Sequence, residues 1–326
     1  MIYPWQSRQW RQLAQQRQQD RLAHALLFQG PAGTGKKHFA HELANALLCR
    51  QPDDTGMACG HCESCNLVRA GTHPDYRLLK PTPPATSTSN NPVLSIKIDA
   101  LREMYRALSE TSQFGGCRIA VIEDADKMPA QAANSLLKTL EEPGRDTLLL
   151  LVSSHPHHLP VTIRSRCQVM RFQVPEAATA IEWLAESGVN DVSTALKLAH
   201  GAPLLAREFV ENHTDERELL VSALNAGARG ESTIVYAQKL AQMPREYLLT
   251  WLLDWVGDLG RLLSCGSDTE LVNEDQRKAL EARARNADTG KVFDLHDQIY
   301  ALIKAEGIAL NPQLLWENLL ISWENI

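Results

Sequence analysis

The sequence lacks the features that mark a free-standing DNA-binding protein or a membrane protein. Its 326 residues carry a formal net charge of -6, whereas DNA-binding proteins usually have a basic surplus. No apolar run approaches the roughly 18 residues needed to span a bilayer. The first residues, MIYPWQSRQWRQL, lack the apolar core of a signal peptide. We therefore expect a cytoplasmic protein in which any contact with nucleic acid is local or supplied by partners.

Short apolar runs alternate with amphipathic segments in the first half of the chain. Hydrophobic residues make up 44% and charged residues 22%, and the length suffices for two or three domains. We predict buried strands within the runs 24–30, 117–128, 147–154 and 167–175. Helices are predicted after the first strand, where Phe39, Leu43 and Leu47 recur every four residues, and at 99–110 and 131–144.

This alternation predicts an α/β domain over residues 1–175, with a parallel sheet covered by helices on both faces. The Pro-, Ser-, Thr- and Asn-rich stretch 80–92 is predicted to be a mobile loop. Helical periodicity dominates afterwards. It indicates a small helical domain at 176–212 and an all-α domain at 213–326.

The stretch GPAGTGKKHF (30–39) has the spacing of a phosphate-binding loop between a strand and a helix. In such a loop, backbone N–H groups and the helix N-terminus bind phosphate oxygens. The residues that this predicts for nucleotide binding are Gly30, Gly33, Thr34, Gly35 and Lys36. The next position should carry a Ser or Thr hydroxyl for Mg²⁺, but it is Lys37, which has donors only. ATP and Mg²⁺ binding by this chain is therefore doubtful.

Two acids follow the strand that begins near residue 117. Glu123 and Asp124 stand where ATPases of this kind carry Asp and then Glu, so the order is reversed. Geometry that is wrong by about 1 Å can reduce a rate on the order of 100-fold. The reversal and Lys37 both point towards inactivity. The alternative is that the two acids only solvate the end of a strand.

Four cysteines have the spacing of a closed tetrahedral zinc site. They are Cys49, Cys59, Cys62 and Cys65. An iron–sulfur run would need a further Cys at the position of Arg69, so structural Zn²⁺ is favoured. His61 is a weaker candidate ligand, and free thiols or a regulatory disulfide are the alternative.

Two arginines, Arg164 and Arg166, lie in TIRSRCQV (162–169) and point the same way if this stretch is extended. The planar guanidinium suits phosphate because it donates two hydrogen bonds at once. An Arg offered to a neighbouring subunit's nucleotide can raise hydrolysis by about 10³–10⁵. A structural ion pair is the alternative.

Several segments together carry a family resemblance. They are the glycine loop, the cysteine cluster, AGTHPDY (70–76), ANSLLKTLEEP (133–143), LPVTIRSRC (159–167) and GAPLLA (201–206). The chain resembles the bacterial DNA polymerase III clamp-loader subunits, which are AAA+ proteins. The resemblance covers most of the first 210 residues, and the C-terminal helices agree in kind only.

The resemblance implies roles for several residues. Arg166 matches the family's arginine finger and would act in trans on ATP bound by an adjacent gamma/tau subunit. The four cysteines match the zinc ligands one for one. Lys138 and TLEEP (139–143) match a common segment to which we assign no chemistry. The last domain would form the collar of a hetero-pentamer with gamma/tau and delta, which loads the sliding clamp on primer-template DNA within the polymerase holoenzyme.

Within the family, the chain resembles a non-hydrolysing subunit rather than the ATP-hydrolysing gamma/tau motor. The motor would carry an Arg where this sequence has Leu204, although Arg207 lies one turn further on. We expect its own ATPase activity to be absent or weak. An active AAA+ ATPase that uses Lys36, and a zinc-containing nucleic-acid-binding module without ATP, are the alternatives.

Overall fold

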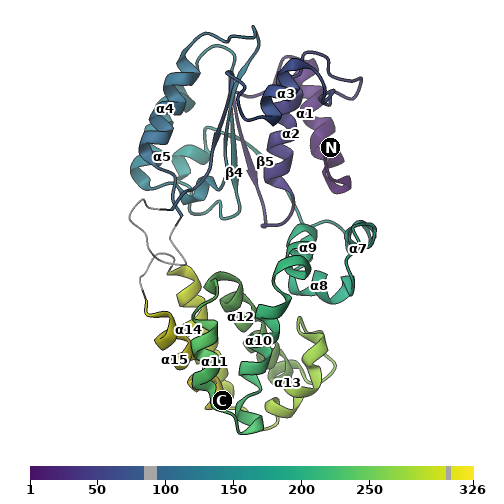
Figure 1. Cartoon of the computed structure of the whole chain (residues 1–326), viewed down its shortest axis with the longest axis vertical. Helices are drawn as coiled ribbons and strands as arrows, with labels where there is room; N and C mark the ends of the chain where they lie inside the picture. Colours follow the sequence, from purple (N-terminus) through teal and green to yellow (C-terminus); the bar gives the residue numbers. More distant parts are fainter. Residues whose placement is uncertain (84–93, 306–309) are drawn as a thin grey trace. The chain divides into compact units, whose positions relative to one another are not determined.

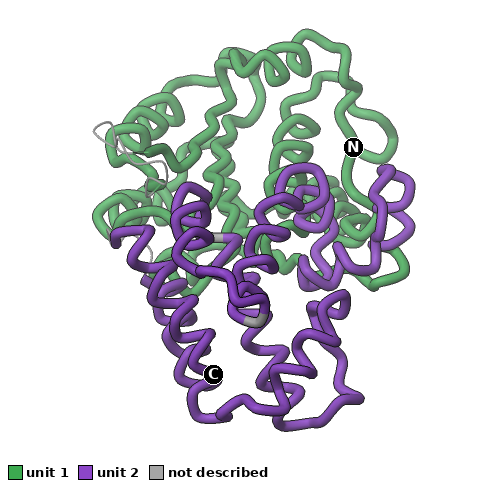
Figure 2. Tube along the Cα trace, turned by 60° about the horizontal axis from the view of Figure 1, so that its bottom comes forward, with its two compact units in different colours: residues 1–85, 94–179 green, residues 86–93, 180–326 purple. Residues whose placement is uncertain are grey.

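The computed structural model describes residues 1–83, 94–305 and 310–326, and these fall into two compact units (Figure 2). The first unit contains residues 1–85 and 94–179, and the second contains residues 180–326. Most of the predicted loop at 80–92 lies outside the described residues. Among the described residues, no helix is long and apolar enough to cross a membrane.

The first unit is built on a five-stranded sheet in which every described pair is parallel. The strand order is β2-β3-β4-β1-β5. The strands are β1 (Ala25–Gln29), β2 (Tyr76–Leu79), β3 (Arg118–Ile122), β4 (Thr147–Ser153) and β5 (Gln168–Arg171). The predicted parallel sheet and four predicted strands are confirmed. We did not predict β2, because only four residues between the cysteine cluster and a polar loop form it.

Helices cover both faces of this sheet (Figure 1). The helices of the unit are α1 (Ser7–Gln18), α2 (Lys36–Leu48), α3 (Glu63–Arg69), α4 (Ile98–Ser109), α5 (Ala130–Glu141) and α6 (Val161–Arg164). Alternate residues of one strand serve the two faces. Leu27 of β1 packs in a core with residues of α4, α5 and α6, whereas Leu26 and Phe28 pack in a second core with residues of α1 and α2. Burial on both faces explains why the strands are continuous apolar runs.

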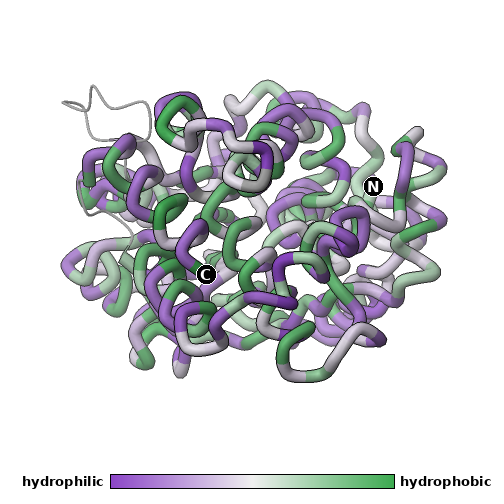
Figure 3. The backbone as a smooth tube through the Cα atoms, turned by 90° about the horizontal axis from the view of Figure 1, so that it is seen from below, coloured by the Kyte–Doolittle hydropathy of each residue, from purple (hydrophilic) through white to green (hydrophobic). Residues whose placement is uncertain are grey.

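The second unit is helical. Its helices are α7 (Ala177–Glu186, which begins in the first unit), α8 (Val192–Leu198), α9 (Pro203–Asn212), α10 (Thr214–Leu224), α11 (Thr233–Leu240), α12 (Arg245–Cys265), α13 (Arg277–Ala284), α14 (Thr289–Lys304) and α15 (Pro312–Glu324). Hydrophobic and hydrophilic residues are interspersed along the backbone (Figure 3). A small core lies among α7, α8 and α9, and a larger one lies among α10 to α15. Phe209 packs against both cores. The division at 176–212 and 213–326 remains our proposal.

Candidate functional site

The glycine loop joins β1 to α2 and takes a backbone conformation that requires glycine. Gly30, Gly33 and Gly35 have φ angles of +152°, +71° and +84°, a region that other residues rarely adopt. A Cβ atom on Gly30 would lie 1.9 Å from the carbonyl oxygen of Phe172, the residue after β5. The sheet packing therefore fixes the first glycine of the loop.

The loop's lysine is bound to the loop itself. Lys36 Nζ donates to the carbonyl oxygen of Pro31 at 2.5 Å, and the hydroxyl of Thr34 donates to the same oxygen at 2.9 Å. Lys36 is only 4% exposed. Burial lowers the pKa of Lys36 to about 8, although the charges of Asp124 and Asp126 oppose this shift. The ammonium thus already has an acceptor within the loop.

The N-terminal segment packs against the end of the loop. Trp5 Nε1 and Gln6 Nε2 both donate to the carbonyl oxygen of Thr34 at 3.0 Å. A Cβ atom on Gly35 would meet the Gln6 amide and the Tyr3 ring at 2.6 Å. Side chains of the N-terminal segment therefore cover the loop at the start of α2.

Lys37, the residue that breaks the motif, forms an ion pair with one of the two predicted acids. Its Nζ lies 2.7 Å from Asp124 Oδ2. Asp124 follows β3 with a φ of +46° and precedes the short 3₁₀ helix η2 (Ala125–Lys127). A Lys ammonium therefore binds the carboxylate that a metal-dependent ATPase keeps for its catalytic chemistry.

The other acid, Glu123, is also bound by its neighbours. It is 6% exposed, and its Oε1 lies 2.7 Å from His41 Nε2 and 3.6 Å from Lys80 Nζ. His41 Nδ1 lies 2.7 Å from the hydroxyl of Tyr76. Burial alone would raise the pKa of Glu123, but the hydrogen bond with His41 and the charges of Lys80, His41 and Lys37 lower it. The structure thus brings the predicted loop and acids together, each with a partner from this chain.

Sequence reasoning missed His41, Tyr76 and Lys80. A signal for His41 was present, because it stands one turn of α2 after Lys37 and shares its face of the helix. Tyr76 is the first residue of the unpredicted strand β2, and Lys80 directly follows that strand. Nothing in the sequence pattern therefore placed them beside Glu123.

The four predicted cysteines form the one metal-competent cluster found among the described residues, with all Sγ atoms within 4.8 Å of one another. Four Sγ–Sγ distances are 3.6 Å (Cys49–Cys59), 3.9 Å (Cys49–Cys62), 4.0 Å (Cys59–Cys65) and 3.5 Å (Cys62–Cys65). A tetrahedron with Zn–S bonds of about 2.3 Å has edges of about 3.8 Å. The thiols therefore fit a zinc ion without rearrangement.

Backbone and side-chain groups support this cluster. The N–H groups of Gln51 and Cys59 donate to Cys49 Sγ at 3.4 Å and 3.3 Å, as expected around thiolate ligands. Ser64, which is fully buried, donates to the carbonyl oxygen of Leu48 at 2.6 Å and lies 3.0 Å from His73 Nε2. These bonds tie α3 to the end of α2. His61 does not contribute a ligand atom to the cluster.

The two arginines near the end of the sheet differ in their surroundings. Residues 161–164 form the short helix α6 rather than an extended segment, so Arg164 and Arg166 do not share a direction by strand geometry. Arg166 Nη2 lies 2.5 Å from Glu141 Oε1, and its Nη1 donates to the carbonyl oxygen of Thr162 at 3.0 Å. Arg164 makes no ion pair within the described part of the chain, and its Nε is buried without an acceptor.

In the second unit, Leu204 lies in the first turn of α9 as predicted. The Arg207 guanidinium lies over the Trp183 ring at 5.2 Å, and its Nε lies 3.7 Å from Glu211. Arg207 therefore has local partners, and these contacts do not indicate that it replaces the Arg expected at the position of Leu204.

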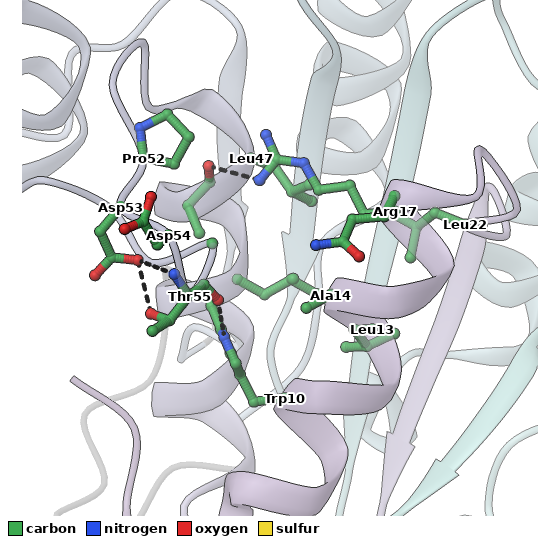
Figure 4. A pocket seen from close by; sticks show the side chains of 14 residues that line it. Trp10, Leu13, Ala14, Arg17, Leu22, Leu47, Pro52, Asp53, Asp54 and Thr55 are labelled. Carbon is green, nitrogen blue, oxygen red and sulfur yellow. Dashed lines mark hydrogen bonds between the residues drawn. The ribbon is translucent and has the colours of Figure 1, made fainter.

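A separate cavity of about 300 Å³ lies between α1, α2 and residues 52–56 (Figure 4). Leu13, Leu43 and Leu47 are among its apolar lining, and Trp10 Nε1 donates to the carbonyl oxygen of Thr55 at 3.1 Å at its edge. None of the predicted site residues lines this cavity, so it is distinct from the glycine loop.

The parallel sheet with its glycine loop, the thiol cluster and the trailing helices agree with the AAA+ clamp-loader fold that the sequence resembles. Residues 5–176 match the family described as DNA polymerase III, delta subunit, and residues 211–325 match its C-terminal family. The DNA polymerase III subunit delta' of Pseudomonas aeruginosa is 34% identical over 100% of this chain and 98% of its own length. The Yersinia pestis subunit delta' is 32% identical over 99% and 95%. The chain therefore belongs to the delta' subunit family of DNA polymerase III.

Among solved structures, a DNA polymerase III gamma subunit-related protein from Thermotoga maritima is 16% identical, with coverage of 96% of this chain and 99% of its own. The TM-score of that similarity is 0.48. The family membership comes from the sequence relatives.

Proposed function

We propose that this chain is a non-hydrolysing subunit of the DNA polymerase III clamp loader. It would assemble with gamma/tau and delta subunits in a cytoplasmic hetero-pentamer that loads the sliding clamp on primer-template DNA. The relatives' shared name, subunit delta', supports the assembly, and the glycine loop supports the division of labour. The helices of residues 213–326 would form the collar of the pentamer.

The observation that carries the non-hydrolysing role is the ion pair between Lys37 Nζ and Asp124 Oδ2 at 2.7 Å. Mg²⁺ is held by oxygen ligands, and a Lys ammonium supplies none. The metal would have to enter beside this cation, while Glu123 is bound to His41 and Lys80. The chain's own loop thus has the fold of a nucleotide site without the groups that activate water.

Weak binding of nucleotide without hydrolysis is the second candidate, because Lys36 and the loop spacing are intact. A phosphate must displace Lys36 from Pro31 and compete with Trp5 and Gln6 at Thr34. Calorimetry of the isolated chain with ATP, with and without Mg²⁺, tests this. We expect no Mg²⁺-dependent heat of binding. In a separate assay of steady-state ATP hydrolysis, turnover that Lys36→Ala abolishes would refute the non-hydrolysing role.

Arg166 is the residue that we assign to a neighbouring subunit's ATP. Its side chain is 36% exposed, and it stands between Ser165 and Cys167 on the segment that resembles the family's finger motif. We expect Arg166→Ala to leave the fold intact and to lower DNA-stimulated ATP hydrolysis of the reconstituted complex by about 10³-fold at the sites it serves. Arg164→Ala is the matched control. Unchanged hydrolysis with Arg166→Ala rejects this assignment.

The four thiols are proposed to hold a structural Zn²⁺. Each cysteine would contribute one thiolate, and the closed set leaves no position for a catalytic water. The ion would tie α3 and the preceding loop to the end of α2. Metal analysis of undamaged protein should find about one zinc per chain.

A further inference from the structure

Arg166 forms an ion pair with Glu141 of its own chain. Glu141 is the last residue of α5 and belongs to the TLEEP segment, to which we assigned no chemistry from the sequence. Its Oε1 lies 2.5 Å from Arg166 Nη2, while Arg166 Nη1 donates to Thr162. Both terminal nitrogens of the guanidinium therefore have acceptors within this chain.

The two backbones that carry this pair are fixed by the core beneath them. Leu140, the neighbour of Glu141, and Cys167, the neighbour of Arg166, are both buried in one hydrophobic cluster together with Ile163 of α6. The side chains above this core are accessible to solvent, because Arg166 is 36% and Glu141 52% exposed. Packing thus fixes the backbone positions of the two residues, while the ion pair between their side chains remains in contact with water.

We infer that Glu141 is a positioning residue that restrains Arg166 until a neighbouring subunit presents a nucleotide. The inference rests on the proposed finger role of Arg166. While Arg166 is bound to the carboxylate, its charge is offset and one N–H of Nη2 is occupied, which leaves fewer donors for a phosphate oxygen. A polyphosphate carries more negative charge than one carboxylate and can displace it once the subunits close.

The exposure of the pair makes this restraint reversible. Exposed ion pairs are weak, so the bound state of Arg166 should outweigh the free state by only about one- to fourfold, and loss of the pair should raise the free population by about two- to fivefold. A buried pair would lock the arginine instead. Glu141 would therefore reduce hydrolysis in a complex that has not closed and would have little effect after closure.

Labelling of the isolated chain tests the restraint without any partner. We would measure the rate at which phenylglyoxal modifies Arg166, by mass spectrometry, in the wild type and in Glu141→Gln. The expected result is an increase of about two- to fivefold. Glu142→Gln is the matched control, since Glu142 is the next exposed acid and makes no ion pair with a described residue. Equal rates in Glu141→Gln and wild type would overturn the inference.

Hydrolysis by the reconstituted complex tests the consequence. Glu141→Gln should raise ATP hydrolysis without DNA by about two- to fivefold, leave the DNA-stimulated maximum unchanged, and have no effect in an Arg166→Ala background. A fall in the DNA-stimulated rate would mean that Glu141 aligns the finger, and the restraint would be wrong. If Arg166→Ala itself changes nothing, the finger role fails, while the labelling result still decides whether Glu141 restrains Arg166.

Discussion

Removal of zinc should destabilise the first unit selectively. With free zinc at about 100 times its dissociation constant, binding to the folded state alone contributes about 2.7 kcal/mol. The first unit contains about 170 residues, and for this size each kcal/mol changes the melting temperature by about 2–4 °C. Chelation should therefore lower the melting temperature of the first unit by about 5–11 °C.

The effect should be local because of where the cysteines lie. Cys49 directly follows α2, and Cys62 and Cys65 lie at the start of α3, so loss of the ion should free the intervening loop and α3 rather than the sheet. Ser64 and His73 would then lose the packing that buries them. The thiols, whose Sγ atoms lie only 3.5–4.0 Å apart, would also become open to oxidation to disulfides.

The assay is calorimetry in zinc buffers of defined free concentration, combined with metal analysis. Cys59→Ser should abolish stoichiometric zinc and reproduce the chelator's effect. Cys265→Ser is the matched control, because Cys265 is exposed at the end of α12 in the other unit. A melting temperature independent of zinc over two decades of free concentration would refute the four-thiolate site.

Two further predictions concern the second unit. Asp258 is fully buried and accepts from the backbone N–H groups of Val272 and Asn273 at 2.9 Å and 2.7 Å, so Asp258→Ala should lower the free energy of unfolding in urea by about 3 kcal/mol. A loss below about 1 kcal/mol would contradict this. His200 Nε2 lies 3.1 Å from Asp254, and that hydrogen bond raises the pKa of His200 despite opposing desolvation. Because the folded pKa is raised, the contribution is present below the unfolded pKa of about 6.5 and is lost as pH rises through the folded pKa. His200→Gln should therefore lower the melting temperature slightly near pH 5.5, as the ring is largely exposed, but not near pH 8; an equal loss at both pH values would exclude this cause.

The sequence predicted the parts of the fold whose signal is local. The runs that form β1, β3, β4 and β5 are largely apolar, and such a run can be recognised from the sequence without knowing which strands pair with it. The edge strand β2 and the short helix α3 were missed. Both are brief and depend on neighbours that are distant in sequence, since β2 exists through its pairing with β3 and α3 is tied to α2 beneath the thiol cluster.

The residues of the candidate site were proposed from the sequence, whereas most of their partners were not. Spacing alone brought the four cysteines and the glycine loop to attention. The partner of Arg166 was not predictable, because Glu141 reaches it from another element of the tertiary structure. For Glu123, the helix position of His41 beside Lys37 was a signal, but the pairing itself depends on tertiary packing. The packing of helices and strands decides which side chains pair across them, and the hydrophobic periodicity of the sequence does not predict these pairs.

The residues of the glycine loop have structural partners within this chain. Gly30 is required by the approach of Phe172, and Gly35 by the side chains of the N-terminal segment. Lys36 is buried on the carbonyl oxygen of Pro31, and Lys37 neutralises Asp124. Each of these contacts gives the residue a structural reason to be present that does not involve a nucleotide. The spacing of a phosphate-binding loop therefore predicts the strand, turn and helix that form it, whereas hydrolysis depends on further groups, and where the motif expects a hydroxyl this chain carries Lys37, paired with Asp124.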